Sequence, residues 1–247
     1  MMEKKTVYET EKEVSMIPHT DVQVENIEFI LKNPRLWNGT QDPFMYQTVV
    51  TLIKDGKELD KVEQPLGVRY YITDPDKGFF LNGKHLPLHG VCRHQERAEV
   101  GNALYPVHHE EDTRIMLDMG VNAVRLAHYP QNEYTVRLAE RMGFLLWEEI
   151  PIWQGIDFKN TATREKAGRM IKEMVMRDKN RCSVAFWGIA NETATSAPRN
   201  EFLKHMKQCC LDIDSTRLIT AAFDLVRFNR ESRNFEMNDS IINILDM

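Results

Sequence analysis

Short apolar runs alternate with amphipathic segments along the second half of the chain. An apolar residue at every third or fourth position predicts a helix, and an apolar run of about four to eight residues predicts a buried strand. The predicted helices cover residues 110–119, 132–142, 161–178 and 201–211. The predicted strands lie near residues 88, 122, 146, 187, 220 and 243. Strands that alternate with helices pair in parallel, so this half of the chain has the pattern of an α/β fold.

The order of these strands and helices is typical of a TIM barrel, the closed (β/α)8 sheet of eight strands. The sixth predicted strand, at residues 241–245, meets the end of the sequence. We therefore expect the N-terminal six strands of a (β/α)8 TIM barrel, and we expect the chain to be part of a longer protein.

The first 72 residues have the pattern of strands and contain no clear helix. The predicted strands are residues 22–31, 44–53 and a segment that ends at residue 72, with a hairpin turn at Asp55-Gly56 after the second. These are too few for a complete β-sandwich, which takes about seven strands. Because residues 74–78 are rich in turn formers, we predict a partial sandwich domain over residues 1–73 and an incomplete barrel domain over residues 74–247.

Composition and charge narrow the possible partners. The chain is 42% apolar and 28% charged, as in ordinary globular proteins, and its net charge of −5 argues against a nucleic-acid surface. No apolar run approaches the roughly 18 residues that cross a membrane, and no apolar stretch follows Met1 as in a signal peptide. The four cysteines have no metal-binding or disulfide spacing. We therefore expect neither a nucleic acid nor a membrane as partner.

Polar side chains follow four consecutive predicted strands. They are Arg93-His94-Gln95-Glu96, Arg125 with His128, Glu148-Glu149 and Asn191-Glu192. Active sites of barrels lie at the carboxyl ends of the strands, so these groups would share one face. A partly desolvated carboxyl group there could hold a proton near neutral pH, as an acid catalyst must. The alternative is a set of chance ion pairs and helix caps, with Asn191 as the cap of an exposed helix.

Five motifs in one order carry a family resemblance. They are Phe80-Leu81-Asn82-Gly83-Lys84, Gly90-Val91-Cys92-Arg93-His94-Gln95, Asn122-Ala123-Val124-Arg125-Leu126-Ala127-His128-Tyr129-Pro130, Trp147-Glu148-Glu149-Ile150-Pro151 and Phe186-Trp187-Gly188-Ile189-Ala190-Asn191-Glu192. Together they resemble glycoside hydrolase family 2, the family of the large β-galactosidases, with β-glucuronidases and β-mannosidases as siblings. More weakly, residues 37–44 and 67–69 resemble the end of that family's immunoglobulin-like domain. The barrel is therefore expected to follow part of an immunoglobulin-like β-sandwich.

The resemblance implies a retaining exo-β-glycosidase that works with two carboxyl groups. Glu192 matches the acid/base, and Asn191 matches a residue that hydrogen-bonds the 2-OH of the sugar. The second carboxyl group is a nucleophilic Glu on the seventh strand, and in retaining enzymes it lies about 5–5.5 Å from the acid/base. No carboxylate of this sequence stands in the sequence context of that nucleophile.

The resemblance also implies which residues bind the sugar and whether a metal takes part. His94, Arg125 and His128 match positions that line the subsite of the non-reducing sugar, and Glu149 is expected to join them. In some metal-dependent members the position of Glu149 helps to hold magnesium. Those members carry further ligands where this chain has residues 150–153, so we expect no metal and no cofactor.

Two further features depend on packing. Trp147, Trp153 and Trp187 could stack on sugar faces, although aromatic residues more often fill cores. Gly188 stands where the family commonly has Ser, which we expect to be a mild change inside a buried strand.

These observations leave three hypotheses about function. The first is an exo-β-glycosidase, and Gln95 with residues 126–129 favours a β-galactosidase over a β-glucuronidase. The second is an inactive fragment that only binds sugar, because the chain has an acid/base but lacks the nucleophile strand. The third is a metal site built from the histidines, whose spacing is unlike that of zinc enzymes. We expect a carbohydrate substrate as partner, and the longer protein could form a homo-oligomer.

Overall fold

The computed structural model of the protein describes residues 5–15, 26–223, 226–229, 231, 233–237 and 239–246. The chain divides into two compact units, residues 1–35 and residues 36–247. The described part of the first unit contains no helix and no strand. The predicted strand at 22–31 lies partly outside the described residues, and its described part has no regular structure. All the elements below belong to the second unit.

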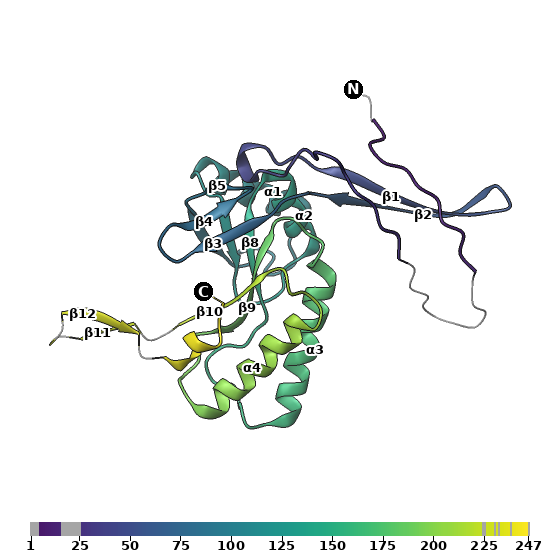
Figure 1. The fold of residues 1–247 in the computed structure, drawn as a ribbon. Helices are drawn as coiled ribbons and strands as arrows, with labels where there is room; N and C mark the ends of the chain where they lie inside the picture. Colours follow the sequence, from purple (N-terminus) through teal and green to yellow (C-terminus); the bar gives the residue numbers. More distant parts are fainter. Residues whose placement is uncertain are drawn as a thin grey trace. The chain divides into compact units, whose positions relative to one another are not determined.

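A parallel sheet of five strands forms the centre of the second unit (Figure 1). Its strands are β6 (Gly90–Arg93), β7 (Ala123–Leu126), β8 (Leu145–Glu149), β9 (Val184–Asn191) and β10 (Leu218–Ala222). They lie side by side in chain order, and each pairs in parallel with the next. The helices α1 (Pro106–Asp118), α2 (Glu133–Met142), α3 (Thr161–Asp178) and α4 (Ala197–Leu211) connect them. The α/β fold is confirmed, and the five strands form part of the wall of a barrel.

The two faces of the sheet are buried in different ways. Leu126, Leu146 and Ile189 pack with residues of α3 and α4 in one core between the sheet and the helices. Leu145 and Phe186 belong to a second core on the opposite face. All eight residues of β9 are buried, which explains the continuous apolar run in its sequence, because a strand covered on both faces need not alternate.

The helix boundaries follow the local start signals. Helix α3 has the predicted limits, and α2 begins one residue later than predicted, after Asn132, whose side chain accepts a hydrogen bond from the Tyr134 amide at 2.8 Å. Helix α1 begins four residues earlier than predicted, at Pro106, because proline fits the first turn of a helix. Helix α4 also begins four residues early, and Ser196 caps it by accepting from the Arg199 amide at 3.2 Å.

The predicted sixth strand at residues 241–245 is wrong. Residues Ser240–Asn243 form a short 3-10 helix, η2, and Asp239 caps it by accepting from the Ile241 amide at 3.0 Å. Ile241 and Ile244 are both buried, and their spacing of three residues suits one helical turn packed on a core rather than a strand. An antiparallel pair of strands that the sequence pattern did not predict, β11 (Val226–Asn229) and β12 (Asn234–Met237), precedes it.

The predicted hairpin near the N-terminus is present. Strand β1 (Tyr46–Lys54) pairs antiparallel with β2 (Lys57–Leu66), and both turn residues, Asp55 and Gly56, have positive φ angles of 51° and 72°. Such a turn matches the twist of the two strands it joins. The expected strand up to residue 72 is divided, because β2 ends at Leu66 and a new sheet begins at Tyr71.

A small antiparallel sheet lies at the amino ends of the parallel strands. It consists of β3 (Tyr71–Asp74), β4 (Gly78–Leu81) and β5 (Lys84–His85). The Tyr71 hydroxyl donates to the carbonyl of Ala185 at 2.9 Å, and the Arg69 Nε donates to the carbonyl of Cys182 at 2.9 Å. Phe79 and Leu81 pack in the core with Leu145 and Phe186. This sheet therefore covers the end of the strands that is opposite to the predicted site.

The side chain of Trp37 packs the segment before β1 against the same end of the sheet. Its side chain is fully buried, and its Nε1 donates to the carbonyl of Glu140 in α2 at 2.8 Å. A short 3-10 helix, η1 (Gly39–Gln41), follows it. An ideal Cβ on Gly143 would lie 2.2 Å from the backbone of Gly39, so only glycine allows α2 to end this close to η1.

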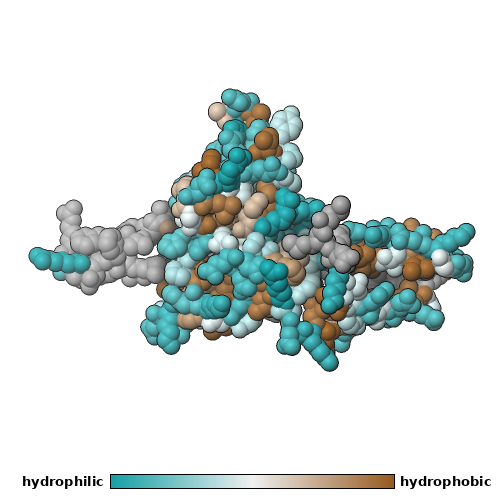
Figure 2. All heavy atoms as spheres, turned by 90° about the horizontal axis from the view of Figure 1, so that it is seen from above, coloured by the Kyte–Doolittle hydropathy of each residue, from teal (hydrophilic) through white to brown (hydrophobic). Residues whose placement is uncertain are grey.

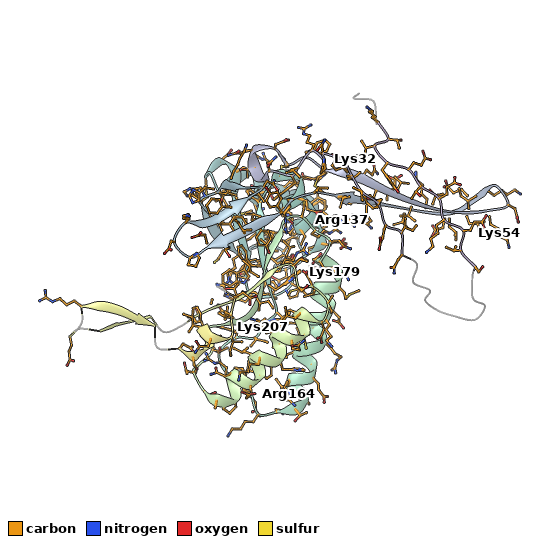
Figure 3. The ribbon with its side chains drawn as sticks, viewed as in Figure 1. Lys32, Lys54, Arg137, Arg164, Lys179 and Lys207 are labelled. Carbon is orange, nitrogen blue, oxygen red and sulfur yellow. The ribbon has the colours of Figure 1, made fainter. Side chains whose placement is uncertain are left out.

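The surface of the described residues is mixed. Figure 2 shows apolar and polar residues interspersed over one face of the molecule. Arg137 of α2 and Arg164 of α3 extend from the outer sides of their helices (Figure 3). No helix among the described residues is both long and apolar enough to cross a membrane.

Two carboxyl groups are buried together between the sheet and the helices. Glu148 and Asp178 are both fully inaccessible to solvent, and neither oxygen of Glu148 has a hydrogen-bond donor among the described residues. Arg177 pairs with Asp178 at 2.5 Å, which leaves Glu148 as the uncompensated member. Burial, followed by the charge of Asp178, raises the pKa of Glu148 well above its ordinary value of 4.5. Burial therefore favours the protonated form of Glu148.

We predict that Glu148→Gln removes a pH-dependent cost of folding. A carboxyl group whose pKa is raised on folding stabilises the fold below about pH 4.5, and this stability is lost as the pH rises through the raised value. When the pH is raised from about 5 to about 8, the unfolding free energy of the unmodified protein should fall by at least ~1 kcal/mol relative to that of the variant. The reason is that one pKa unit is worth about 1.4 kcal/mol. Denaturant unfolding at both pH values measures this difference. The exposed Glu165→Gln on α3 is the control, and equal pH profiles for Glu148→Gln and the unmodified protein would contradict the prediction.

Candidate active site

Three neighbouring strands bring one polar side chain each to the face of the sheet that points away from the helices. Arg125 comes from β7, Glu149 from the end of β8 and Asn191 from the end of β9. The Arg125 Nε donates to Glu149 Oε2 at 3.0 Å, and its Nη2 donates to Oε1 at 2.9 Å. The same Nη2 donates to Asn191 Oδ1 at 2.6 Å. The predicted meeting of polar groups at the strand ends therefore exists for these three strands.

Two histidines extend this network. His128 Nδ1 lies 2.6 Å from Glu149 Oε1, and the ring of His94 stands edge-on to that of His128 with 5.0 Å between centroids. A carboxylate can only accept, so Nδ1 of His128 carries the hydrogen in this contact. The 3.2 Å approach of Arg125 Nη2 to the same nitrogen is then a close contact between two donors. His128 consequently keeps its Nε2 for other partners, and His94 is exposed beside it.

Glu149 is the shared partner of this network. Its side chain is 1% exposed, and its two oxygens face Arg125 and His128. A buried carboxylate requires such compensation, because an unpaired charge is costly away from water. The predicted contact of Glu149 with substrate stays a prediction, and the geometry favours an effect through Arg125 and His128. Among the described residues, no group of three or more His, Cys, Asp or Glu side chains is arranged to hold a metal ion.

Asn191 and Glu192 end the central strand. Asn191 is 2% exposed, its Oδ1 is taken by Arg125, and its Nδ2 has no hydrogen-bond partner in the described part of the chain. Glu192 is half-buried, has a positive φ of 50°, and donates its amide hydrogen to the carbonyl of Ala222 at 3.0 Å. A non-glycine residue in this conformation is strained, and such residues cluster at functional sites. The alternative of a helix cap at Asn191 is wrong, because α4 begins at Ala197.

Other strand-end residues face away from this network. Arg93 pairs with Asp112 of α1 at 2.7 Å and donates to Gln131 at 2.5 Å. Glu148 lies on the helix side of β8, as described above. The Gln95 Oε1 accepts from the amide of Asn132 at 2.6 Å, so this side chain holds a loop in place. Consecutive residues such as Glu148 and Glu149 are separated in this way, because successive side chains of a strand point to opposite faces.

The side chains of Trp147, Trp153 and Trp187 lie in different environments. Trp187 is 0% exposed, and its Nε1 donates to Asp214 at 3.0 Å, so it packs in the core. The ring of Trp147 lies under the Arg125 guanidinium, with 4.8 Å from Cζ to the ring centroid. Trp153, in contrast, is 51% exposed on the loop after β8. The sequence alone did not distinguish these environments.

Gly188 makes room for the network. An ideal Cβ at this position would lie 2.3 Å from Trp147 Nε1 and 2.7 Å from Glu149 Cβ. The expectation that glycine in place of serine is a mild change is therefore wrong, because Trp147 and Glu149 occupy the space of a side chain. This need could only be seen from the packing of β8 against β9.

The fold and the site together define a class of protein. A parallel β/α sheet carries, at the carboxyl ends of its strands, a half-buried Glu beside a fixed set of amide, guanidinium and imidazole groups. Buried donors of this kind recognise hydroxyl-rich ligands, and barrel enzymes place their chemistry at this end of the strands. This arrangement is typical of the active-site end of a (β/α)-barrel enzyme.

Comparisons with known proteins give the family. The model of the TIM barrel domain of glycosyl hydrolases family 2 matches residues 72–245, and a second model, described as glycosyl hydrolases family 2, matches residues 2–69. The chain belongs to glycosyl hydrolases family 2, as its sequence motifs predicted. The domain boundary predicted after residue 73 stays a prediction.

Similar proteins carry two different activity names. A β-glucuronidase of Bacteroides fragilis is 48% identical over 225 residues, which are 88% of this chain and 32% of that protein. A β-galactosidase of Thermoanaerobacterium thermosulfurigenes is 36% identical over 80% of this chain and 26% of its own length. The crystal structure of a putative β-galactosidase from Bacteroides fragilis matches with a TM-score of 0.77 and 33% identity, over 82% of this chain and 30% of that one. The chain thus spans about a third or less of the length of these relatives.

We predict that Gly188→Ala lowers the unfolding free energy by roughly 1–3 kcal/mol, the usual cost of adding a methyl group to a packed core. The new methyl group must displace Trp147 or Glu149, and both lie against the strand. Thermal and denaturant unfolding measure the loss.

Gly155→Ala is the matched control for this prediction, because a Cβ there would meet no heavy atom within 4 Å. Equal stability of the two variants would show that the space at Gly188 is not needed.

Proposed function

We propose that this chain carries the acid/base half of a retaining exo-β-glycosidase, with Glu192 as the acid/base. The observation that carries the proposal is the position of Glu192, which directly follows Asn191 and so adjoins the network of Arg125, Glu149 and His128. The nucleophile is a carboxylate from a strand outside these 247 residues. Glu149 is not available for that role, because Arg125 and His128 occupy its oxygens.

The reaction then proceeds in two displacements. The nucleophilic carboxylate attacks C1 of the sugar, the glycosidic C–O bond breaks, and Glu192 gives its proton to the leaving oxygen. Water next attacks C1 of the glycosyl-enzyme while Glu192 takes a proton from it, and the carboxylate nucleophile leaves. Both steps together retain the configuration at C1 and restore the protonated Glu192.

The remaining side chains hold the sugar. The unpaired Nδ2 of Asn191 is a buried donor suited to the 2-OH, because a buried donor gains most from a fixed acceptor. His94, Arg125 and His128 supply further donors for the hydroxyls of the non-reducing sugar. Glu149 fixes the orientation of Arg125 and His128, which removes the entropy cost of ordering them when substrate binds.

β-Glucuronides are the substrates that we propose first, and β-galactosides are the second candidate. The sequence favoured β-galactosides partly through Gln95, but the side-chain oxygen of this residue accepts from the Asn132 amide. The relative that is 48% identical is named a β-glucuronidase, whereas the β-galactosidase described above is 36% identical. These observations support the glucuronide over the galactoside.

The substrate assay uses the complete protein encoded by the gene together with the 247-residue chain alone. We predict that the complete protein cleaves p-nitrophenyl β-glucuronide with a kcat/KM at least about tenfold above that for p-nitrophenyl β-galactoside, a difference of ~1.4 kcal/mol in transition-state binding. The chain alone should cleave neither, because it lacks a nucleophile. The reverse preference would favour the galactosidase, and activity of the short chain would contradict the assignment of the nucleophile to another strand.

We predict that Glu192→Ala in the complete protein lowers kcat by about 10²–10⁴-fold on substrates with a poor leaving group, the usual contribution of a general acid–base. The loss should be far smaller on the first step with an activated aryl leaving group, which departs without a proton. Added azide should restore turnover and give a β-glycosyl azide, since this anion attacks the glycosyl-enzyme without a base. The exposed Glu201→Ala on α4 is the control, and equal losses on both kinds of substrate without azide rescue would contradict the role.

A further inference from the structure

Trp153 is an exposed aromatic side chain beside the proposed acid/base. It follows β8 by four residues and is 51% exposed, whereas Trp37 and Trp187 are fully buried. Its indole makes no hydrogen bond to any described residue, unlike those of Trp37 and Trp187. About half of the surface of Trp153 is therefore accessible to a bound molecule.

The backbone that carries this side chain is fixed on both sides. The amide of Asn191 donates to the carbonyl of Ile152 at 2.8 Å, and the amide of Gln154 approaches the carbonyl of Asn191 at 3.4 Å. Trp153 and Asn191 thereby form an isolated parallel bridge between the loop and β9. Ile150 and Ile152 are buried in the core below. The exposed ring is therefore presented by a firmly held backbone.

The bridge also sets the direction of the ring. Partners in register on neighbouring strands point their side chains to the same face, because both follow the same pleat. The Asn191 side chain points to the site, where its Oδ1 accepts from Arg125. Trp153 accordingly lies on the site face of the sheet, one residue in register from Glu192.

We infer that Trp153 is a specificity-determining substrate contact, an aromatic platform for the leaving group of the glycoside. This inference depends on the proposed role of Glu192, whose proton goes to the leaving oxygen. The donors assigned to the non-reducing sugar are Arg125 in β7, His128 just after β7 and His94 just after β6. Trp153 instead lies between β8 and β9 next to Glu192, where the group beyond the scissile bond has to pass. A flat indole suits the apolar face of an aromatic aglycone.

The test compares two leaving groups on the same sugar in the complete enzyme. Phenyl and methyl β-glycosides of the cleaved sugar are assayed with the unmodified enzyme, Trp153→Ala and Trp153→Phe. We expect Trp153→Ala to lower kcat/KM for the phenyl glycoside by about three- to tenfold, as for the loss of one aromatic pair, and that for the methyl glycoside by less than about twofold. Trp153→Phe keeps a ring and should retain most of the phenyl preference. Tyr70→Ala removes an exposed aromatic from the opposite end of the strands and should change neither value.

Each outcome bears on one of the two proposals. If the unmodified enzyme cleaves neither glycoside, the proposed function fails and this inference fails with it. If the enzyme is active and Trp153→Ala leaves the ratio of phenyl to methyl turnover unchanged, whether both values fall together or neither falls, only the platform is overturned. A thermal unfolding measurement on Trp153→Ala accompanies the kinetics, and a selective loss for the phenyl glycoside at unchanged melting temperature supports the platform.

Discussion

The bidentate pair of Arg125 with Glu149 is the interaction on which the candidate site depends. Glu149 is 1% exposed, so its charge has left water and must be compensated by fixed partners. Arg125 meets both of its oxygens, and the same guanidinium holds the Asn191 amide. Leaving one member of such a buried pair without its partner commonly costs about 3–5 kcal/mol. The folded sheet therefore enforces one arrangement of the guanidinium, and with it the direction of the Asn191 Nδ2 beside Glu192.

The alternation of side chains along β8 places the site and the buried helix layer on opposite faces of the sheet. Glu148 and Glu149 are neighbours in β8, yet Glu149 faces the site and Glu148 faces the helices, where burial raises its pKa. Glu149 pairs with Arg125 and His128, whereas Glu148 lies buried near Asp178. A shift of one residue in the register of β8 would exchange the two environments and place a charge in the helix layer. The apolar residues on either side, Leu145 and Leu146, fix that register because each belongs to its own core.

The sequence predicted the features that arise from local periodicity. The limits of α3 and the buried run of β9 follow from patterns within one segment, and the strand-end motifs led correctly to Arg125, Glu149 and Asn191 as neighbours. The features that it missed depend on contacts between distant segments, such as the Arg69 hydrogen bond to Cys182 and the space at Gly188. The false sixth strand has a local cause. A few apolar residues fit a strand or a helical turn equally well, and only the burial of both Ile241 and Ile244 decides for the turn.

The network of Arg125, Glu149 and Asn191 lies within the sheet and not on its loops. Arg125, Glu149 and Asn191 come from three adjacent strands, so their geometry is set by the pairing of β7, β8 and β9 alone. Relatives named β-glucuronidase and β-galactosidase both match most of this chain, so a match over these strands does not by itself distinguish the two names. Binding contacts that differ between substrates are more commonly placed on loops than on paired strands. Trp153 stands on such a loop, which is tied to β9 at Asn191, and the contact that we propose for its ring is with the leaving group and not with the sugar.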